Sequence, residues 1–240
     1  MNQKFGPEFP ADEVVTATGG KLLQGEAACR LRGVSTDSRQ LVQGNLYIPL
    51  KGDRFDGHDF LGEAIARGAG GLLMDAHHAG MLETVSKIPG SCPVIVVEDT
   101  LRALGDLARF WRRRSGQPVI AITGSSGKTT TKEMTAAVLE QTFSVLKTEG
   151  NLNNLIGLPL TLLRLERSHD LAIVELGTNA RGEIKRLTEI AEPDIGLVTN
   201  IGPAHLEGLK TLENIREEKG DLYGTMSRSG VAVFNADDEA

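Results

Sequence analysis

Residues 123 to 133, with the sequence TGSSGKTTTKE, have the composition of a phosphate-binding loop. Gly124 and Gly127 permit a tight turn in which backbone N–H groups converge on an anion, and the positive end of the following helix dipole adds to the attraction. Lys128 supplies a point charge for the outer phosphates, and the hydroxyl of Thr129 can serve as a ligand for Mg²⁺. The stretch predicts a nucleotide site, but by itself it does not separate a kinase, a GTPase and an ATP-driven ligase.

The spacing of this loop is shorter than the common one. The pattern G-x-x-x-x-G-K-[ST] would place its first glycine at position 122, where the chain has Ile122. A glycine turn before an ordinary helix is the alternative, but Gly-Lys-Thr-Thr after a β-branched run favours a nucleotide site. The sequence has no [NT]-K-x-D stretch to read guanine, which disfavours a GTPase. The candidate phosphate contacts are Gly124, Ser125, Ser126, Gly127, Lys128, Thr129 and Thr130.

Three further polar residues come at or just past the ends of predicted strands: Glu175, Asn200 and His205. Ligands of open α/β sheets bind at the carboxyl ends of the strands. Each side chain alone is typical of a surface or capping position. Their shared place beside a phosphate loop favours a metal and phosphate site.

Strand-like and helix-like stretches alternate through the second half of the chain. This alternation predicts an α/β fold with a mostly parallel sheet and helices on both faces. The expected strands are 119–123, 144–148, 171–176, 195–200 and 230–235, and the expected helices follow the phosphate loop and cover 156–165, 180–191 and 212–226.

Composition limits the setting. The chain has 240 residues, of which 40% are hydrophobic, enough for one large or two modest domains. Its net charge of -6 with dispersed basic residues disfavours a nucleic-acid partner. Cys29 and Cys92 lie too far apart in sequence to suggest a disulfide framework or a zinc site. No signal peptide or membrane-spanning run is present, so we expect a cytoplasmic, monomeric protein without membrane insertion.

The sequence predicts two domains, 1–114 and 115–240. Apolar residues from Leu101 to Trp111 recur at helical spacing, and SGQP then breaks that helix before the strand of the phosphate loop. We expect Trp111 to lie in the core and the three arginines at 112–114 to form a solvated helix end.

Several motifs together resemble the Mur ligase family of peptidoglycan synthesis. They are TGSSGKTTTKE (123–133), TEGNLNNLIGLPLTLL (148–163), VELGTNARGEI (174–184), TNIGPAHLEG (199–208) and EEKGDLY (217–223). The stretch STDSRQLVQGNLYIPLKGDRFDGHDF (35–60) is similar to the uridine-nucleotide domain of these enzymes. Within the family, GNLNNLIGLPLTLL and AHLEG look like the branch that adds a D-alanyl-D-alanine dipeptide. The resemblance covers nearly the whole chain.

The resemblance implies ATP-dependent amide bond formation. The terminal carboxylate of UDP-N-acetylmuramoyl-tripeptide would take the γ-phosphoryl group of ATP, and the amine of D-alanyl-D-alanine would attack the acyl phosphate and release phosphate. A carboxylate is a poor electrophile with a poor leaving group, and phosphorylation corrects both if cations and N–H donors hold the anions together. The implied cofactors are ATP and two Mg²⁺ ions.

The resemblance also implies roles for the polar residues. Thr129 and Glu175 would hold one Mg²⁺ at the β- and γ-phosphates, and His205 would help to hold a second. Lys128, Glu175, His205 and Lys219 would form the catalytic set. Lys219 would carry CO₂ as a carbamate, an anion that can orient Mg²⁺, although a lysine in REEKGD taken alone is typical of a solvated helix.

Three asparagines complete the implied nucleotide site. Asn154 would lie near the phosphate and the muramoyl end of the substrate, and Asn200 would support the same site. Asn235 would approach the nucleotide. Asparagines also favour turns, which is the alternative explanation for Asn154 and its neighbours.

The first domain would hold the uridine nucleotide. Phe55 offers a stacking face for the base, between glycines at 52 and 57 that allow close approach. A polar loop between strands is the alternative. The implied substrate contacts here are Thr36, Ser38, Arg39, Asp53, Arg54 and Phe55. We expect His77 and His78 to be surface residues.

Family members continue into a Rossmann-like C-terminal domain, so we expect this chain to be a fragment that lacks it and turns over slowly or not at all. Two other functions stay open. One is a Mur ligase that adds a single amino acid, and the other is a non-catalytic nucleotide-binding module.

Overall fold

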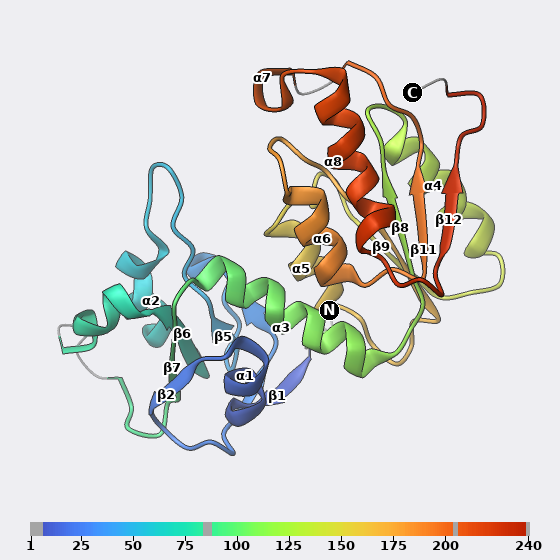
Figure 1. The fold of residues 1–240 in the computed structure, drawn as a ribbon. Coiled ribbons are helices and arrows are strands. Elements are labelled where there is room, and N and C mark those ends of the chain that lie inside the picture. Colours follow the sequence, from blue (N-terminus) through green and yellow to red (C-terminus); the bar gives the residue numbers. More distant parts are fainter. Residues whose placement is uncertain (1–6, 84–87, 204–205, 239–240) are drawn as a thin grey trace. The chain divides into compact units, whose positions relative to one another are not determined.

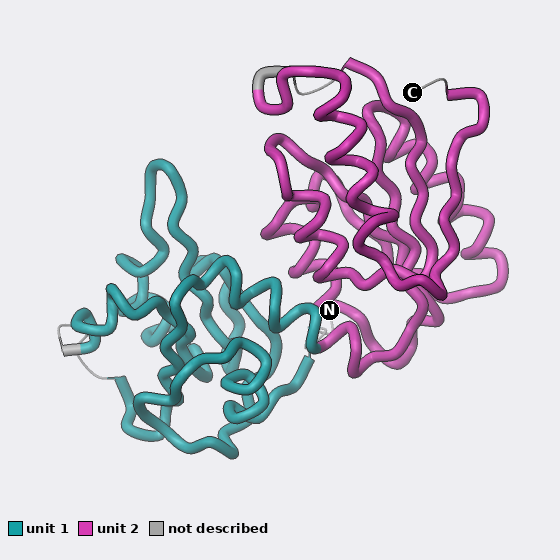
Figure 2. Tube along the Cα trace, in the orientation of Figure 1, with its two compact units in different colours: residues 1–110 teal, residues 111–240 magenta. Residues whose placement is uncertain are grey.

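The computed structural model describes residues 7–83, 88–203 and 206–238. The chain divides into two compact units, Met1–Phe110 and Trp111–Ala240 (Figure 2). The division falls within helix α3 (Thr100–Ser115), and the sequence-based boundary after residue 114 falls at the end of the same helix. Among the described residues, no helix is long and apolar enough to cross a lipid bilayer.

The first unit contains a five-stranded sheet in the order β2-β7-β6-β5-β4, together with a small antiparallel pair of β1 and β3. The β2–β7 pair is antiparallel, and the other strands of the sheet pair in parallel. Its strands are β1 (Glu8–Pro10), β2 (Lys21–Gln24), β3 (Arg30–Arg32), β4 (Val34–Ser35), β5 (Leu46–Tyr47), β6 (Gly71–Asp75) and β7 (Val94–Val97). Its helices are α1 (Ala11–Thr18), α2 (Leu61–Ala66), the first part of α3, and the 3₁₀ turns η1 (Ser38–Gln40), η2 (Gly57–Phe60) and η3 (Ala76–Glu83).

The second unit is built on a five-stranded, fully parallel sheet in the order β12-β11-β8-β10-β9 (Figure 1). This confirms the α/β architecture predicted from the alternating pattern. Its strands are β8 (Val119–Thr123), β9 (Val145–Lys147), β10 (Leu171–Glu175), β11 (Ile195–Val198) and β12 (Val231–Phe234). Its helices are α4 (Lys128–Leu139), α5 (Gly157–Leu162), α6 (Glu183–Ala191), α7 (Leu206–Leu209) and α8 (Leu212–Thr225).

The order of the strands places α4 on one face of this sheet and the helices α5, α6 and α8 on the other. Parallel strands are joined by right-handed crossovers, and the chain moves one way across the sheet from β8 to β9 and the opposite way in every later step. The loops that follow the neighbouring strands β8 and β11 therefore turn to opposite faces. Such a reversal is where open parallel sheets bind ligands, and the phosphate loop follows β8 at this point.

The last residues of α3, which belong to the second unit, make side-chain hydrogen bonds within that unit. The indole N–H of Trp111 donates to the carbonyl of Leu165 (2.9 Å), but Trp111 is half-buried and does not lie in the core as expected. The expectation for Arg112 is wrong, because its guanidinium donates to the carbonyls of Ala191 and Glu192 (both 2.9 Å) and is not a solvated end. A cation at these carbonyls is stabilised by the negative end of the α6 dipole.

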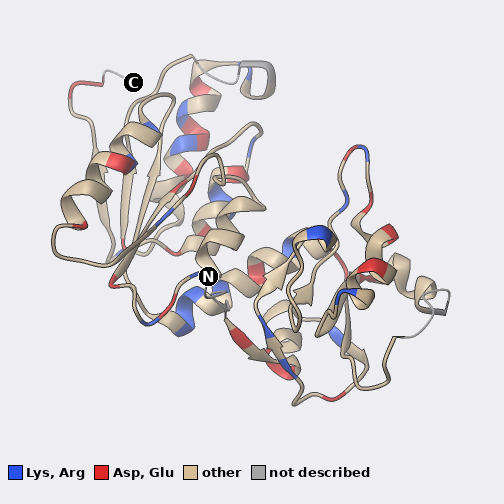
Figure 3. Ribbon diagram, turned by 180° about the vertical axis from the view of Figure 1, so that it is seen from behind, with Lys and Arg blue, Asp and Glu red and all other residues tan. Residues whose placement is uncertain are grey.

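Charged residues are interspersed over both units (Figure 3). Helix α8 illustrates the mixture, since Arg216, Glu217, Glu218 and Lys219 follow one another along it. Two of these four, Glu218 and Lys219, are nevertheless buried.

Candidate functional site

The phosphate loop has a backbone that glycine alone accommodates at two positions. Gly124 has a φ of 146°, and a Cβ built there would lie 1.9 Å from Oγ1 of Thr199 on the neighbouring strand end. Gly127 has a φ of 76° and caps the N-terminus of α4. The loop therefore passes against β11 and then turns sharply into a helix whose positive end faces the loop.

Asn200, two residues past the end of β11, fixes the shape of this loop. Its backbone carbonyl accepts the N–H of Ser125 (2.9 Å), and its side-chain Oδ1 accepts the N–H of Ser126 (3.0 Å). The hydroxyl of Ser125 in turn donates to the carbonyl of Gly202 (2.8 Å). The structure thus brings Asn200 to the loop, in the role of a clamp on its backbone.

The start of α4 carries unused donors. The backbone N–H groups of residues 127 to 130 donate to no described residue, and N–H groups at a helix start need partners from outside the helix. The ammonium of Lys128 folds back to the carbonyl of Gly124 (2.8 Å), so the positive charge lies across the same loop. A cluster of N–H donors beside an ammonium is the arrangement that binds phosphate groups.

Glu175, at the carboxyl end of β10, lies directly opposite this helix start. Its Oε2 accepts the hydroxyl of Thr129 at 2.8 Å, and its Oε1 accepts the side-chain N–H of Asn153 at 2.9 Å. The carboxylate is buried while Thr129 is exposed, so the pair lies at the edge between protein and solvent. A hydroxyl and a carboxylate that meet beside phosphate donors form an oxygen-only ligand set, which suits Mg²⁺.

On the sequence alone, Asn154 was named as a site residue and Asn153, whose side chain contacts Glu175, was missed. The structure places the side chain of Asn154 at the start of α5, where its Oδ1 accepts the N–H groups of Ile156 (3.1 Å) and Gly157 (2.8 Å). The two asparagines are adjacent and chemically identical. Only the backbone direction after β9, which no local pattern reveals, decides which of them reaches Glu175.

Lys219 is buried, with 1% of its surface exposed. Its Nζ makes no hydrogen bond or ion pair with the described residues. Burial, together with the nearby charge of Lys128, lowers the pKa of Lys219 to about 8, although Glu218 acts in the opposite direction. A buried lysine with a lowered pKa holds a larger share of neutral amine than a surface lysine does.

The carboxylate of Glu218 has a structural role at the start of α6. Its carboxylate accepts the N–H groups of Gly182 (2.6 Å) and Ile184 (2.7 Å) and the hydroxyl of Thr178 (3.2 Å). A carboxylate at the start of α6 is stabilised by the helix dipole. This cap fixes α8 against α6 and so helps to hold Lys219 in its buried position.

His205 lies outside the described residues. Asn235 follows β12, where its side chain accepts the N–H of Asp237 (3.1 Å), and Asp238 of the same turn accepts the N–H of Ile201 (2.6 Å). The turn after β12 therefore contacts the segment that follows Asn200.

In the first unit, Phe55 stands near the tip of a hairpin. The hairpin is closed by hydrogen bonds from Gly52 N–H to the carbonyl of Phe55 and from Gly57 N–H to the carbonyl of Leu50, both at 2.9 Å. The side chain of Phe55 is 74% exposed, and Asp53 and Arg54 beside it make no hydrogen bond or ion pair with the described residues. These three residues are free to contact a ligand.

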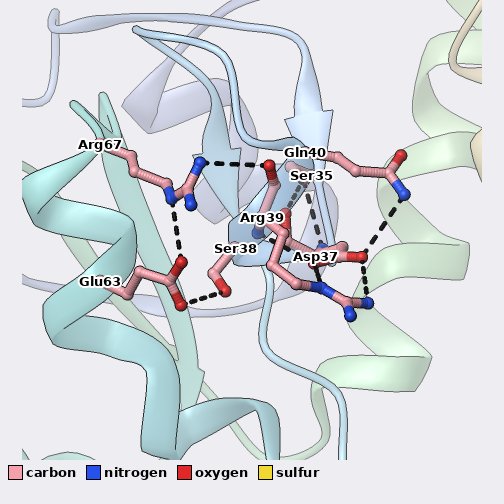
Figure 4. A network of polar contacts seen from close by, with 7 residues as sticks. All are labelled: Ser35, Asp37, Ser38, Arg39, Gln40, Glu63 and Arg67. Atoms are coloured by element: carbon pink, nitrogen blue, oxygen red, sulfur yellow. Dashed lines mark hydrogen bonds and ion pairs between the residues drawn. The ribbon is translucent and has the colours of Figure 1, made fainter.

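Ser38 and Arg39 are instead engaged in a network of protein contacts (Figure 4). Ser38 is buried and its hydroxyl donates to Glu63 (2.9 Å), while the guanidinium of Arg39 donates through two nitrogens to Asp37 (2.9 and 2.8 Å). The pKa of Asp37 is lowered, chiefly by the hydrogen bond from Arg39. Thr36, the neighbour of this network, is half-buried.

Two histidines form a cluster at the base of the same hairpin. His58 Nδ1 lies 2.6 Å from Asp56 Oδ1, His78 Nδ1 lies 2.7 Å from Asp75 Oδ1, and the two rings stack at 3.9 Å with an interplanar angle of 9°. The expectation that His78 is a surface residue is therefore wrong, whereas His77 is exposed. Although burial opposes it, hydrogen bonds from the histidines hold the pKa values of Asp56 and Asp75 below the usual one.

The geometry of this cluster argues against a shared metal ion. Ligand atoms of Asp56, His58 and His78 lie within 4.8 Å of one another. A histidine nitrogen, however, binds a metal through a lone pair in the plane of its ring. The planes of two stacked, nearly parallel rings do not converge on one point. The cluster instead anchors the hairpin to the end of β6.

Comparison with known proteins identifies the family of this chain. The Mur ligase middle domain matches residues 122–240, and the model described as "Mur ligase family, catalytic domain" matches residues 30–112. The UDP-N-acetylmuramoyl-tripeptide–D-alanyl-D-alanine ligase of Haemophilus influenzae is 41% identical over 219 residues, which are 90% of this chain and 46% of the relative.

Solved structures give the same assignment. A crystal structure of MurF from Acinetobacter baumannii is similar with a TM-score of 0.86 and 34% identity, over 98% of this chain and 50% of that one. MurF from Thermotoga maritima in complex with ADP is similar with a TM-score of 0.75 and 35% identity, over 85% of this chain and 46% of that one. The chain belongs to the Mur ligase family. It spans about half the length of the relatives that it matches.

Proposed function

We propose that the protein containing this chain is an ATP-dependent, ADP-forming ligase that joins D-alanyl-D-alanine to UDP-N-acetylmuramoyl-tripeptide in peptidoglycan precursor synthesis. The observation that carries the proposal is the meeting of Thr129 and Glu175 at 2.8 Å beside the unused N–H donors of the phosphate loop. The relatives from Haemophilus influenzae and Escherichia coli carry both substrates in their names. In this proposal residues 1–114 hold the UDP-linked substrate and residues 115–240 hold ATP.

In this proposal, different residues of the second unit bind the phosphates, bind Mg²⁺ and position these groups. The N–H groups at the start of α4 and the ammonium of Lys128 would bind and orient the phosphates, in the place where negative charge accumulates during phosphoryl transfer. Thr129 and Glu175 would hold a Mg²⁺ ion, which when bound neutralises charge on the β- and γ-oxygens. Asn153 and Asn200 would keep this carboxylate and this loop in position.

We assign His205 and Lys219 to a second Mg²⁺ site. With a pKa of about 8, Lys219 holds roughly one neutral amine in ten molecules at pH 7. A neutral amine can attack CO₂, form the N–C bond of a carbamate and release a proton. The product would be an anion where an ammonium would repel Mg²⁺, which is why a lysine is useful at this buried position.

The proposal includes the cellular compartment and the oligomeric state of the enzyme. We infer a cytoplasmic monomer; the free thiols of Cys29 and Cys92 support the reducing compartment. Burial raises the pKa of the Cys92 thiol to about 11, so this group is poorly reactive.

The test of the proposal is a ligation assay with the full-length protein. UDP-N-acetylmuramoyl-tripeptide and Mg²⁺-ATP are incubated with either D-alanyl-D-alanine or single amino acids, and ADP and the ligated product are measured. We expect product with the dipeptide. Product only with a single amino acid would favour the other branch of the family, and nucleotide binding without any product would favour a non-catalytic module.

A Phe55→Ala substitution tests the assignment of the first unit. We expect it to weaken the binding of UDP-N-acetylmuramoyl-tripeptide by about 1–3 kcal/mol, the range found when an aromatic face that stacks on a base is removed. ADP binding should not change. Calorimetric titration of the 240-residue chain measures both affinities.

The matched control is Phe143→Ala, which removes a phenylalanine that is 44% exposed in the second unit. We expect this variant to bind the UDP-linked substrate as the unmodified chain does. Equal weakening of UDP-substrate and ADP binding by Phe55→Ala would contradict the assignment of the hairpin.

A further inference from the structure

The hydrogen-bond ladder between β9 and β10 is altered at Thr148, the residue whose carbonyl would face the backbone N–H of the candidate metal ligand Glu175. The two strands pair in parallel with Lys147 opposite Ile173, and Thr148 N–H continues the ladder by donating to the carbonyl of Ile173 (3.1 Å). In a regular parallel ladder the carbonyl of Thr148 would next accept the N–H of Glu175. In this structure the N–H of Glu175 donates to the hydroxyl of Thr148 instead (3.0 Å).

The carbonyl released from the ladder is held by a buried lysine. Nζ of Lys132 donates to the carbonyl of Thr148 at 2.6 Å, and only 1% of the surface of Lys132 is exposed. Nζ also forms an ion pair with Glu133 at 2.9 Å. Burial of an ammonium costs free energy that an apolar side chain of similar length would avoid. The contact with the carbonyl of Thr148 offsets most of this cost, because an ion pair with the exposed Glu133 contributes little.

The position of Lys132 on α4 connects this contact to the nucleotide site. Lys132 follows Lys128 by four residues and Thr129 by three, so the three side chains share one face of the helix. The phosphate-binding lysine, the proposed metal-ligand hydroxyl and the lysine that holds Thr148 therefore belong to one helix.

The chain leaves the sheet after Thr148 and returns to Glu175 through Asn153. Asn153 donates to the carboxylate of Glu175 (2.9 Å), and the N–H of Gly177 donates to the carbonyl of Asn153 (2.8 Å). Glu175 is thereby fixed at its backbone by the hydroxyl of Thr148 and at its carboxylate by Asn153 and Thr129. Of these contacts, the one at the backbone depends on the carbonyl of Thr148 being held elsewhere.

We propose that Lys132 is a positioning residue for Glu175. Its ammonium holds the carbonyl of Thr148 outside the β9–β10 ladder, so the hydroxyl of Thr148 accepts the backbone N–H of Glu175 in place of that carbonyl. The chain after Thr148 is then directed so that Asn153 reaches the carboxylate of Glu175. The proposal adds a residue to the account of the nucleotide site, and it rests on the proposed role of Glu175 as a Mg²⁺ ligand. The hydrogen-bond exchange itself does not depend on that role.

The first test needs no nucleotide. Amide hydrogen exchange at Glu175 is measured by NMR in the 240-residue chain with Thr148→Val and Thr148→Ser. Valine has the shape of threonine without the hydroxyl, so the N–H of Glu175 loses its acceptor while Lys132 still holds the carbonyl. We expect faster exchange at Glu175 in Thr148→Val and nearly normal exchange in Thr148→Ser.

A double variant separates the proposal from a general loss of packing. In Lys132→Met with Thr148→Val the carbonyl is free to return to the ladder, so exchange at Glu175 should be slower than in Thr148→Val alone. Additive loss of protection in the double variant, or equal protection in the valine and serine variants, would overturn the proposed exchange of partners.

The second test measures how strongly Mg²⁺ favours ADP binding, by calorimetry with and without the ion. In Lys132→Met we expect the gain from Mg²⁺ to fall by at least about tenfold, as is usual when a group that orients a metal ligand is lost. ADP affinity without Mg²⁺ should be unchanged. Glu133→Gln is the control, because it removes the exposed ion-pair partner and keeps the contact with Thr148.

The two proposals fail in different ways. If Mg²⁺ does not favour ADP binding in the unmodified chain, the role of Glu175 as a Mg²⁺ ligand is wrong, while the exchange experiment still decides the role of Lys132 in the ladder. If Mg²⁺ favours binding equally in the unmodified chain and in Lys132→Met, the positioning role is wrong and the metal ligand stands.

Discussion

Replacement of Lys219 by methionine is expected to stabilise the second unit at pH 7 and to abolish ligation by the full-length protein. The pKa of Lys219 falls from 10.5 in the unfolded chain to about 8 in the fold, mainly because of burial. The folded state therefore binds this proton less tightly than the unfolded state does, which corresponds to a cost of about 3 kcal/mol at pH 7. Methionine has a similar length and no charge, so the cost disappears.

The sign of this effect gives it a characteristic pH dependence. Between pH 8 and pH 10.5 the unfolded state holds more protons at this site than the folded state, so the free energy of unfolding of the unmodified chain rises with pH. The advantage of Lys219→Met should be full at pH 7 and vanish above the unfolded pKa. Thermal melts of the 240-residue chain across this range, in buffer free of bicarbonate, measure it.

Lys185→Met is the matched control, because Lys185 is exposed on the neighbouring helix α6. We expect its melting temperature to stay close to that of the unmodified chain over the same range. In the full-length protein, added bicarbonate should not restore ligation to Lys219→Met, since no amine remains to be carboxylated. Normal ligation by this variant would rule out the carbamate.

Replacement of Glu175 by glutamine should remove the dependence of nucleotide binding on Mg²⁺. The amide keeps the size of the side chain but not its charge, and it offers one oxygen where the carboxylate offers two. We expect the Mg²⁺-dependent part of ADP affinity to fall on the order of 100-fold, at least as much as when a group that only orients a metal ligand is lost. Calorimetric titration of the 240-residue chain with ADP, with and without Mg²⁺, measures the change.

The same substitution should act in the opposite direction when Mg²⁺ is absent. A carboxylate beside the phosphates repels them, so ADP should bind Glu175→Gln at least as tightly as it binds the unmodified chain under that condition. Glu213→Gln, an exposed position at the start of α8, is the control and should leave both affinities unchanged. An unchanged gain from Mg²⁺ in Glu175→Gln would mean that this carboxylate is not a metal ligand.

Much of the second unit could be predicted because its elements are locally encoded. Apolar β-branched runs alternate with amphipathic stretches, and the glycines at 124 and 127 mark a turn that only glycine adopts easily. The same alternation led to Glu175 and Asn200, since it located the strand ends. These features depend on neighbours in the sequence and are visible without a structure.

The remaining features depend on contacts between distant segments. Lys219 and Lys132 are lysines in helices with ordinary composition, and only tertiary packing buries them. The choice between Asn153 and Asn154 follows from the way the chain leaves the sheet at Thr148. The environment of His78 is set by Asp75 and by a ring contributed from position 58. No periodicity records such contacts, which is why the expectation for His78 was wrong.

The proposed function requires that this chain bind UDP-N-acetylmuramoyl-tripeptide and Mg²⁺-ADP. The most direct measurement is a thermal melt of the 240-residue protein alone, with each ligand, and with UDP only, because a ligand that binds only the folded state raises the melting temperature. We predict a cooperative melt that shifts upward with Mg²⁺-ADP and with the muramoyl-tripeptide, and less with UDP. A cooperative melt that neither ligand moves would contradict the claim.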